Sequence, residues 1–241
     1  MTLPSPFEPP APRRRRRWPW ILITLLLTLL LAFAGTVGWR VFTERRAIRQ
    51  LEEVGLSFDR GELVAKEGTA AATGVSRLRN FNSLAPALRR LNPEMIYIGD
   101  AGCPALENLD GLRGLTALEW IVIKNCASLR NLHGTNGLPH LKSLQLGGCA
   151  ALQSLDGLSD LSELEYLSLS GCTKLQNADG LNVLINVREI TLGNCPALQN
   201  VDAIKGLKKL EKINLGRCDS LSSEAIAALK NAMPKTNIYV D

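Results

Sequence analysis

The sequence of 241 residues is short of the side chains that enzymes most often use. It contains two His, and Phe, Trp and Tyr together make up 5% of the chain. Phosphate-binding patterns such as GxGxxG and the P-loop are missing, and no Ser-His-Asp or Cys-His arrangement is suggested. A globular enzyme of this size usually carries more of these residues. The composition therefore indicates a repetitive scaffold, and we expect neither enzymatic activity nor a cofactor.

Positive charge is also scarce over most of the chain, although the formal net charge is +5. Residues 1–94 hold 15 Lys and Arg against 8 Asp and Glu, a balance of +7, which leaves 13 against 15, a balance of −2, for residues 95–241. A groove for nucleic acid needs clustered positive charge on the folded domain. We therefore expect no nucleic-acid partner, and no small-molecule substrate.

The longest stretch without charge lies near the N-terminus. Residues 1–17 are rich in proline and end in five arginines, so we interpret them as a flexible tail. Residues 18–39, WPWILITLLLTLLLAFAGTVGW, carry no charge, and as a helix of about 33 Å they would cross a bilayer. Tryptophans at both ends of the stretch suit a membrane interface. We expect an uncleaved transmembrane signal anchor, and a signal peptide cleaved near Ala32-Phe33-Ala34 is the open alternative.

Arginines on both sides of this stretch set its expected orientation. Arg13–Arg17 lie on one side and Arg40, Arg45, Arg46 and Arg49 on the other. Contiguous arginines beside the membrane resist translocation more strongly. We therefore expect a single-pass protein of the cytoplasmic (inner) membrane, with its N-terminus inside and the bulk of the chain on the periplasmic or extracytoplasmic side.

Residues 40–80 are expected to form a juxtamembrane linker with a short helix. The segment ERRAIRQLEEVG (Glu44–Gly55) has apolar residues on one helical face and stops at a glycine. After the linker, SLAPALRRLNP (Ser83–Pro93) brings three leucines onto one helical face. Its place just before a set of repeats favours a helix that caps a stack.

From about residue 94 the sequence repeats every 23 residues. The best copies begin at Leu118, Leu141, Leu164, Val187 and Leu210, and they share the pattern L-x-x-L-x-L-x-x-C-x-x-L-x-x-L-x-G-L-x-x-L. The L-x-L core alternates as a strand does, and the later leucines suit a turn or a short 3₁₀ segment. No single repeat can bury its own leucines, so neighbouring repeats must stack.

The first copy departs from this pattern. In the segment Met95–Leu112, Asp100 stands where later copies carry Ile or Leu. The pattern therefore predicts a strand at Ile96–Ile98, shifted by two residues, in a capping type of repeat.

The last copy departs from it as well. It changes into SSEAIAALKNAMPKTNIYV (Ser222–Val240). Ser223 is predicted to cap a helix over residues 223–233, and Ile238–Val240 to add a last strand.

The repeats resemble the leucine-rich-repeat family, whose motif L-x-x-L-x-L-x-x-N/C-x-L is matched by LKSLQLGGCAAL (Leu141–Leu152) and its copies. They also resemble bacterial members whose repeats read C-x-x-L-x-x-L-x-G-L. The resemblance covers about residues 94–241. It implies an α/β solenoid, a right-handed coil with a parallel concave sheet and helical caps, here preceded by one transmembrane helix. We assign residues 81–241, with about six repeats, to this domain.

Six cysteines follow one another at intervals of 23 residues: Cys103, Cys126, Cys149, Cys172, Cys195 and Cys218. A metal site needs thiolates that converge, typically in C-x-x-C pairs, so no metal site is expected. The resemblance implies a structural ladder at the Asn or Cys position, with each side chain facing the interior and hydrogen-bonded to loop backbone. Disulfides stay open, because stacked strands about 5 Å apart lie within disulfide reach, although parallel side chains give them poor geometry.

The resemblance also implies that the concave strand face is the surface for a protein partner. The candidates on that face are Trp120, Val122, Lys124, Ser143, Gln145, Tyr166, Ser168, Glu189, Thr191, Lys212 and Asn214. Trp120 and Tyr166 are the best anchors, since exposed aromatic residues are enriched at binding hot spots. The alternative is that both rings pack against the N-terminal cap.

The expected function is that of a membrane-anchored leucine-rich-repeat protein, a scaffold for protein–protein contact through its concave face and for bilayer contact through residues 18–39. One alternative is an envelope spacer without a specific ligand. Another is a regulatory subunit or an inhibitor of an enzyme. The feature that agrees least with an extracytoplasmic repeat domain is its six cysteines, because that compartment is expected to be oxidising.

Overall fold

A computed structural model describes residues 18–65, 77–99 and 102–240, with side chains from residue 32 onward. The N-terminal tail, residues 1–17, lies outside the described residues. The chain divides into two compact units, Met1–Thr43 and Glu44–Asp241. Helix α1 (Trp18–Glu53) runs from the first unit into the second. Within the described residues, no helix has both the length and the apolarity needed to cross a bilayer.

The last turns of α1 belong to the core of the second unit. Ala47 and Leu51 are buried there, beside Leu56 and Leu63 of the first two strands. The helix ends at Glu53, and Gly55 then turns the chain with a φ of 83°, which is accessible to glycine at little cost. The helix expected over Glu44–Gly55 is therefore the end of α1.

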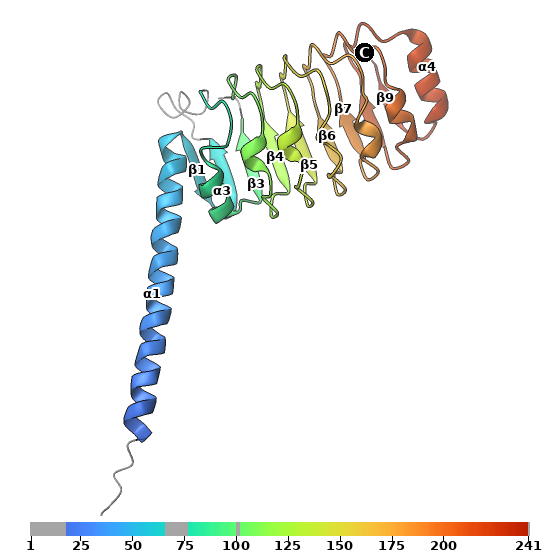
Figure 1. Ribbon diagram of the computed structural model, residues 1–241. Coiled ribbons are helices and arrows are strands. Elements are labelled where there is room, and N and C mark those ends of the chain that lie inside the picture. The colour runs from blue at the N-terminus through green and yellow to red at the C-terminus, as the bar shows by residue number, and fades with distance from the viewer. Residues whose placement is uncertain (1–17, 66–76, 100–101, 241) are drawn as a thin grey trace, which may run out of the picture. The chain divides into compact units, whose positions relative to one another are not determined.

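The described strands form a nine-stranded sheet in which each strand lies beside the next one in the sequence (Figure 1). The strands are β1 (Leu56–Asp59), β2 (Glu62–Ala65), β3 (Met95–Ile98), β4 (Trp120–Ile123), β5 (Ser143–Leu146), β6 (Tyr166–Ser168), β7 (Glu189–Thr191), β8 (Lys212–Asn214) and β9 (Asn237–Tyr239). Strands β1 and β2 are antiparallel, and β2 to β9 are parallel. The sheet is the stacked arrangement that the 23-residue period predicts.

The hairpin of β1 and β2 is a departure from the sequence analysis, which treated residues 40–80 as a linker. Arg60 and Gly61 form the two-residue turn, both with positive φ, as tight hairpins require. The hairpin is part of the stack because Leu63 pairs with Ile96 of β3 and is fully buried. Four residues of alternation gave too weak a signal to identify β2 from the sequence.

The first repeat has the shifted strand that was predicted. β3 pairs in register with β4, so that Met95 is opposite Trp120 and Ile98 opposite Ile123. The distance in sequence from β3 to Cys103 is two residues longer than the distance from strand to cysteine in later repeats. Helix α3 (Ala85–Leu91), expected from its leucines, buries Leu88 before this repeat.

In four of the described coils, a short 3₁₀ helix lies on the side opposite the strands. These helices are η1 (Asp110–Leu112), η2 (His133–Thr135), η3 (Leu181–Val183) and η4 (Asp202–Gly206). The recurring glycine of the repeat lets these segments approach, since a Cβ at Gly111 or Gly134 would collide with the backbone of Phe81 or Leu109. Between the two sides lies a continuous core of leucines. Each fully buried leucine stabilises the fold by about 1.5–3 kcal/mol.

The C-terminal end closes the stack with α4 (Ser223–Ala232) and β9. The helix lies close to the predicted range of 223–233, but its N-cap is Ser222, not Ser223. Ser222 has extended backbone, and its Oγ accepts a 3.1 Å hydrogen bond from the Ala225 N–H. Strand β9 covers Asn237–Tyr239, close to the predicted Ile238–Val240.

Candidate protein-binding face

The candidate site is the sheet face turned away from the core, called here the open face. Along β4, β6 and β8, buried residues alternate with exposed or half-buried ones, as the twofold period of a strand requires. In-register pairing therefore places equivalent residues in two rows. The first row holds Glu62, Met95, Trp120, Ser143, Tyr166, Glu189, Lys212 and Asn237, and the second holds Val64, Tyr97, Val122, Gln145, Ser168, Thr191, Asn214 and Tyr239.

Ten of the eleven residues predicted for this face lie in or beside these rows with at least part of their surface exposed. The exception is Ser143, which was predicted to be exposed and is only 7% exposed. Its small side chain lies between Trp120 and Tyr166 in the first row, and its Oγ accepts a 3.3 Å hydrogen bond from Gln145 Nε2. Lys124, also predicted for this face, follows β4 and is exposed.

The part of the open face on β2, β3 and β4 is rich in apolar side chains, and we call it the apolar half. Trp120 is 38% exposed and Tyr97 is 37% exposed, while Val64, Met95 and Val122 are half-buried beside them. The Tyr97 ring lies over Gly99, where an added Cβ would be 2.8 Å from Tyr97 Cε1. Glycine at that position therefore leaves room for the ring.

The part on β6, β7 and β8 is polar, and we call it the paired half. On its surface Lys212 Nζ donates a 2.9 Å hydrogen bond to Glu189 Oε1. The Lys212 ammonium also lies 5.8 Å from the Tyr239 ring centroid. The hydrogen bond to Glu189 raises the pKa of Lys212.

A row of charged residues immediately before the strands runs along both halves. Its order is Glu94, Glu119, Lys142, Glu165, Arg188 and Glu211. Arg188 lies between two carboxylates, with Nη1 2.6 Å from Glu211 Oε1 and Nε 3.8 Å from Glu165 Oε2. Lys142 Nζ is 2.8 Å from Glu119 Oε2, which raises the pKa of Lys142. The same ammonium lies 5.6 Å from the Trp120 ring centroid.

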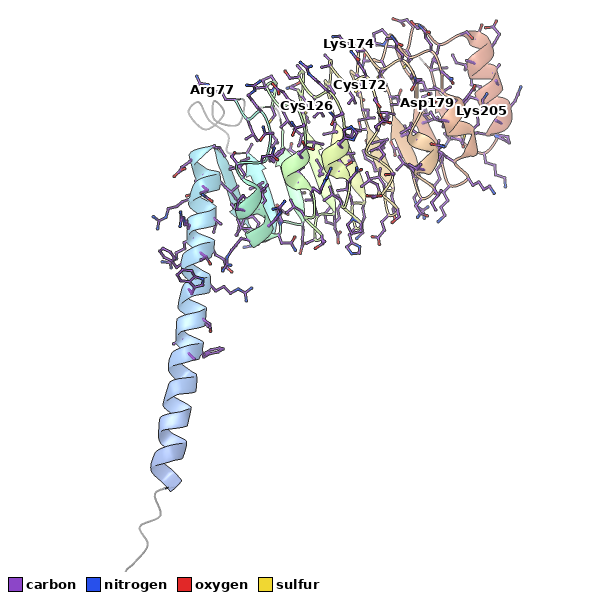
Figure 2. The ribbon with its side chains drawn as sticks, viewed as in Figure 1. Arg77, Cys126, Cys172, Lys174, Asp179 and Lys205 are labelled. Atoms are coloured by element: carbon purple, nitrogen blue, oxygen red, sulfur yellow. The ribbon has the colours of Figure 1, made fainter. Side chains whose placement is uncertain are left out.

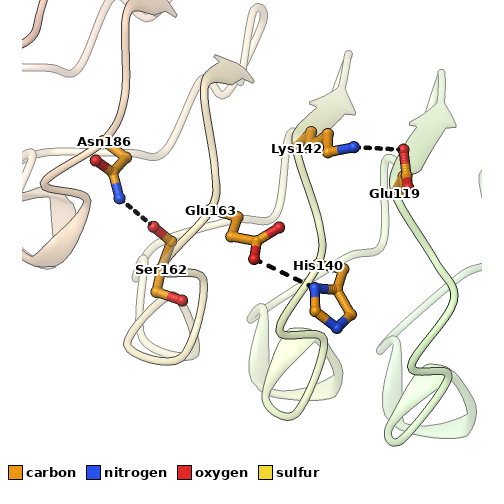
Figure 3. Close-up of polar contacts among 6 residues, drawn as sticks. All are labelled: Glu119, His140, Lys142, Ser162, Glu163 and Asn186. Atoms are coloured by element: carbon orange, nitrogen blue, oxygen red, sulfur yellow. Dashed lines mark hydrogen bonds and ion pairs between the residues drawn. The ribbon is translucent and has the colours of Figure 1, made fainter.

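A second row of polar contacts lies in the loops before the strands. His140 Nδ1 is 3.2 Å from Glu163 Oε1, and Asn186 Nδ2 donates a 2.6 Å hydrogen bond to the Ser162 carbonyl (Figure 3). Lys209 Nζ donates a 2.6 Å hydrogen bond to Asn186 Oδ1. Each contact joins residues of neighbouring coils, so side chains outside the core also connect the repeats.

Two open hollows lie along the paired half. One of about 190 Å³ is lined by Lys142, Glu163, Glu165, Asn186, Arg188 and Lys209. The other, of about 410 Å³, is lined by Glu165, Tyr166, Arg188, Glu189, Glu211, Lys212 and Asn237. Most of their charged groups are already in ion pairs, such as Arg188 with Glu165 and Glu211, so a ligand would have to replace existing pairs to bind there.

The predicted anchors Trp120 and Tyr166 lie on the open face, and Tyr166 is half-buried between Ser143 and Glu189. Helix α3 instead packs beside η1, on the other side of the core. Sequence reasoning missed Glu62, Val64, Met95 and Tyr97 as members of this face. The first two lie in the hairpin assigned to the linker, and the last two in the repeat that departs from the pattern. The alternation of MIYI (Met95–Ile98) was the available signal.

All six cysteines are buried, and none is in a disulfide. They follow the strands along one edge of the stack, where Figure 2 labels Cys126 and Cys172. The thiols donate to main-chain carbonyls, as in Cys218 Sγ to Leu192 O at 3.1 Å and Cys195 Sγ to Leu169 O at 3.5 Å. Cys195 Sγ also lies 3.7 Å from the Gly193 carbonyl oxygen, and Cys126 Sγ donates to the Ile123 carbonyl at 3.4 Å. These thiols thus donate hydrogen bonds to main-chain carbonyls in the interior.

The interior raises the pKa of these thiols. Burial raises the pKa of Cys103 to about 12. A hydrogen bond with Cys172, together with burial, raises the pKa of Cys195 to about 12. The preceding thiol and burial likewise raise the pKa of Cys149, Cys172 and Cys218. Thiols that resist ionisation are poor nucleophiles and poor metal ligands. In the described part of the chain, no three His, Cys, Asp or Glu side chains are placed to hold a metal ion.

Comparison with known proteins agrees with this fold. Residues 142–228 match the family model of the leucine-rich-repeat domain of endo-β-N-acetylglucosaminidase EndoS. Internalin C2 of Listeria monocytogenes superposes with a TM-score of 0.50 at 17% identity, covering 80% of this chain and 81% of that one. The leucine-rich-repeat domain of the type III effector XopL gives a TM-score of 0.45 at 22% identity, covering 81% of this chain and 82% of the other.

No curated protein matches the sequence. The match over residues 142–228, the coil architecture and the parallel sheet nevertheless agree with one another. The chain therefore has a fold like that of leucine-rich-repeat solenoids, and residues 142–228 match a leucine-rich-repeat family model.

Proposed function

We propose that the protein binds another protein through the open face of its leucine-rich repeats. The observation that carries the proposal is the exposure of two large aromatic side chains, Tyr97 and Trp120, on one sheet face. Large exposed aromatic residues with apolar neighbours are typical of binding hot spots. Solenoids bind partners through extended surfaces of this kind.

We further propose that residues 18–39 anchor the protein in the cytoplasmic membrane, with the repeats on the extracytoplasmic side. The stretch is uncharged and lies within α1. Near its end, Phe33, Val37 and Trp39 are exposed, as side chains in contact with lipid would be. The arginine flanks support the orientation. A periplasm-active reporter fused after Asp241 tests it: activity is expected, and a silent reporter with full-length expression would reverse the orientation.

Site-specific photo-cross-linking in cells tests the binding proposal. A photoreactive amino acid in place of Tyr97 is expected to give a discrete adduct with a second protein. The matched control places it at Val183 of η3, which is 40% exposed on the other side of the coil. An adduct from Val183 alone would move the binding surface to the other side. If neither position gives an adduct, the result would favour a spacer without a ligand.

The full chain, or residues 44–241, is the appropriate material for binding studies. A fragment that begins at residue 81 would lack β1 and β2. It would also lose Leu51, Leu56 and Leu63, all of which are fully buried in the core. Such a fragment would expose the buried side of β3 and remove part of the open face.

A further inference from the structure

The two halves of the open face differ in how their charges are satisfied. In the paired half, Glu189 contacts Lys212, and Arg188 contacts both Glu165 and Glu211. A partner that covers these groups must desolvate pairs that are already formed, which gains little affinity. The paired half therefore offers few unsatisfied groups to a partner.

The apolar half is bordered by carboxylates without such pairing. Glu62 and Glu94 are exposed. Among the described residues, neither carboxylate makes an ion pair or a hydrogen bond. Glu94 precedes β3 beside Glu119, and the Glu119 carboxylate is already held by Lys142. Glu94 thus adjoins another acidic residue in the neighbouring coil, about 5 Å away along the stack.

The positive groups near this border either contact other side chains or lie far from Glu62 and Glu94. Lys142 lies between Glu119 and the Trp120 ring. Arg60 is 3.9 Å from Asp59, and Lys124 lies at the opposite end of β4. The first row of the open face begins with Glu62 and continues through Met95 to Trp120, so an acidic group stands directly beside the apolar side chains.

From this arrangement we infer that the apolar half binds a protein segment in which an apolar side chain is flanked by Lys or Arg. The apolar residue packs on Tyr97, Trp120 and Val122, and the cations pair with Glu62 and Glu94. The exposed aromatic area supplies affinity, and the two carboxylates supply selectivity and speed of encounter. This inference rests on the proposed function, because it names the chemistry of the partner for the same face.

Equilibrium binding of short peptides to the full chain in detergent micelles tests the inference. The probe is the end-blocked octapeptide SKRLFKRS, and its matched controls are SEDLFEDS, which reverses the charges, and SKRSSKRS, which removes the apolar residues. We expect a Kd of about 10–100 μM for the probe, as for a small interface. Each control peptide is expected to bind at least about tenfold more weakly. The probe should also bind more weakly at high salt.

Two protein variants separate the two halves. The double variant Glu62→Gln with Glu94→Gln should weaken probe binding about fivefold to tenfold and reduce its salt dependence. Glu189→Gln removes a carboxylate from the paired half and should change the Kd less than twofold. All three substitutions are on the open face or its border and preserve side-chain shape, so folding should be unaffected.

Three results would overturn the inference. They are equal binding of SEDLFEDS, a larger loss with Glu189→Gln than with the double variant, and a tenfold gain in affinity when residues 2–17 are deleted. The last result would mean that the chain's own arginine-rich tail occupies the face. If the probe fails while a photoreactive residue at Tyr97 still gives its adduct, the partner has another chemistry and the proposed function stands. If the Tyr97 adduct is also missing, both this inference and the proposed function of the open face fail.

Discussion

The apolar half and the paired half of the open face are built on the same repeat, yet their surfaces have opposite character. At equivalent positions of the first row, the apolar half carries Met95 and Trp120, whereas the paired half carries Glu189 and Lys212. The repeat specifies the buried positions and leaves the outward ones free. In the paired half, the outward charges connect neighbouring coils. In the apolar half, the side chains remain available to a partner.

The largest effect is expected from the strand that supports the apolar half. Leu63 of β2 is fully buried, and Leu63→Ala should lower the free energy of unfolding by about 2–5 kcal/mol. Urea unfolding monitored by circular dichroism measures the change. An effect below about 0.5 kcal/mol would mean that the hairpin is a peripheral linker, as the sequence alone indicated. Ser57→Ala on the partner strand β1 is the control, since that side chain is half-buried.

A smaller effect is expected in the cysteine ladder, which runs beneath both halves. Cys149 is fully buried. Cys149→Leu must add volume to a packed corner and should cost about 1–3 kcal/mol. Cys149→Asn should cost less, because an amide can donate and accept the hydrogen bonds that the neighbouring thiols make. Thermal unfolding compares the two variants, and equal or reversed losses would contradict the structural role of the ladder.

The ladder also predicts that stability falls at high pH. The pKa of Cys195 is raised to about 12 in the folded protein, whereas an unfolded thiol has a pKa of about 8.5. Its contribution is therefore fully present below the unfolded pKa and is lost as pH rises toward the folded pKa, by about 1.4 kcal/mol per unit. Urea unfolding between pH 8 and pH 11 should show a shallower decline for Cys195→Ala than for the wild type. Parallel curves would indicate that the thiol ionises equally in both states.

The smallest effect is expected from the surface pairs of the paired half. Arg188→Ala removes the cation between Glu165 and Glu211, but all three side chains are more than half exposed. Exposed pairs contribute at most about 1 kcal/mol, so the midpoint of urea unfolding should change only slightly. A loss of about 3 kcal/mol or more, which is typical of buried pairs, would mean that the paired half is a structural element as important as the leucine core.

The sequence predicted the fold well wherever the 23-residue repeat is regular. Five good copies determine the strands from β4 to β8, since each leucine position has to stay buried in every coil. The hairpin was missed because β2 joins the stack through Leu63 and Ile96, residues that are far apart in the sequence. That long-range pairing is absent from any local pattern.

The candidate site was predicted in part. Trp120 and Tyr166 were recognised because the repeat register assigns them to the outward face. Tyr97 was not, because two additional residues before Cys103 displace its strand from that register. The burial of Ser143 depends on the size of its neighbours in adjacent coils, which the register does not report. The difference between paired and unpaired carboxylates depends on side-chain geometry, so it became visible only in the structure.

The most direct test compares an exposed aromatic residue of the apolar half with one on β9, beside the paired half. Trp120→Ala and Tyr239→Ala remove rings that are 38% and 48% exposed, and binding of SKRLFKRS to each full-length variant is measured by titration. Trp120→Ala should weaken binding at least about tenfold, as expected for a hot-spot aromatic residue. Tyr239→Ala should leave the Kd within about a factor of two of the wild-type value, a change of about 0.4 kcal/mol. The opposite ranking of the two variants would contradict the assignment of binding to the apolar half.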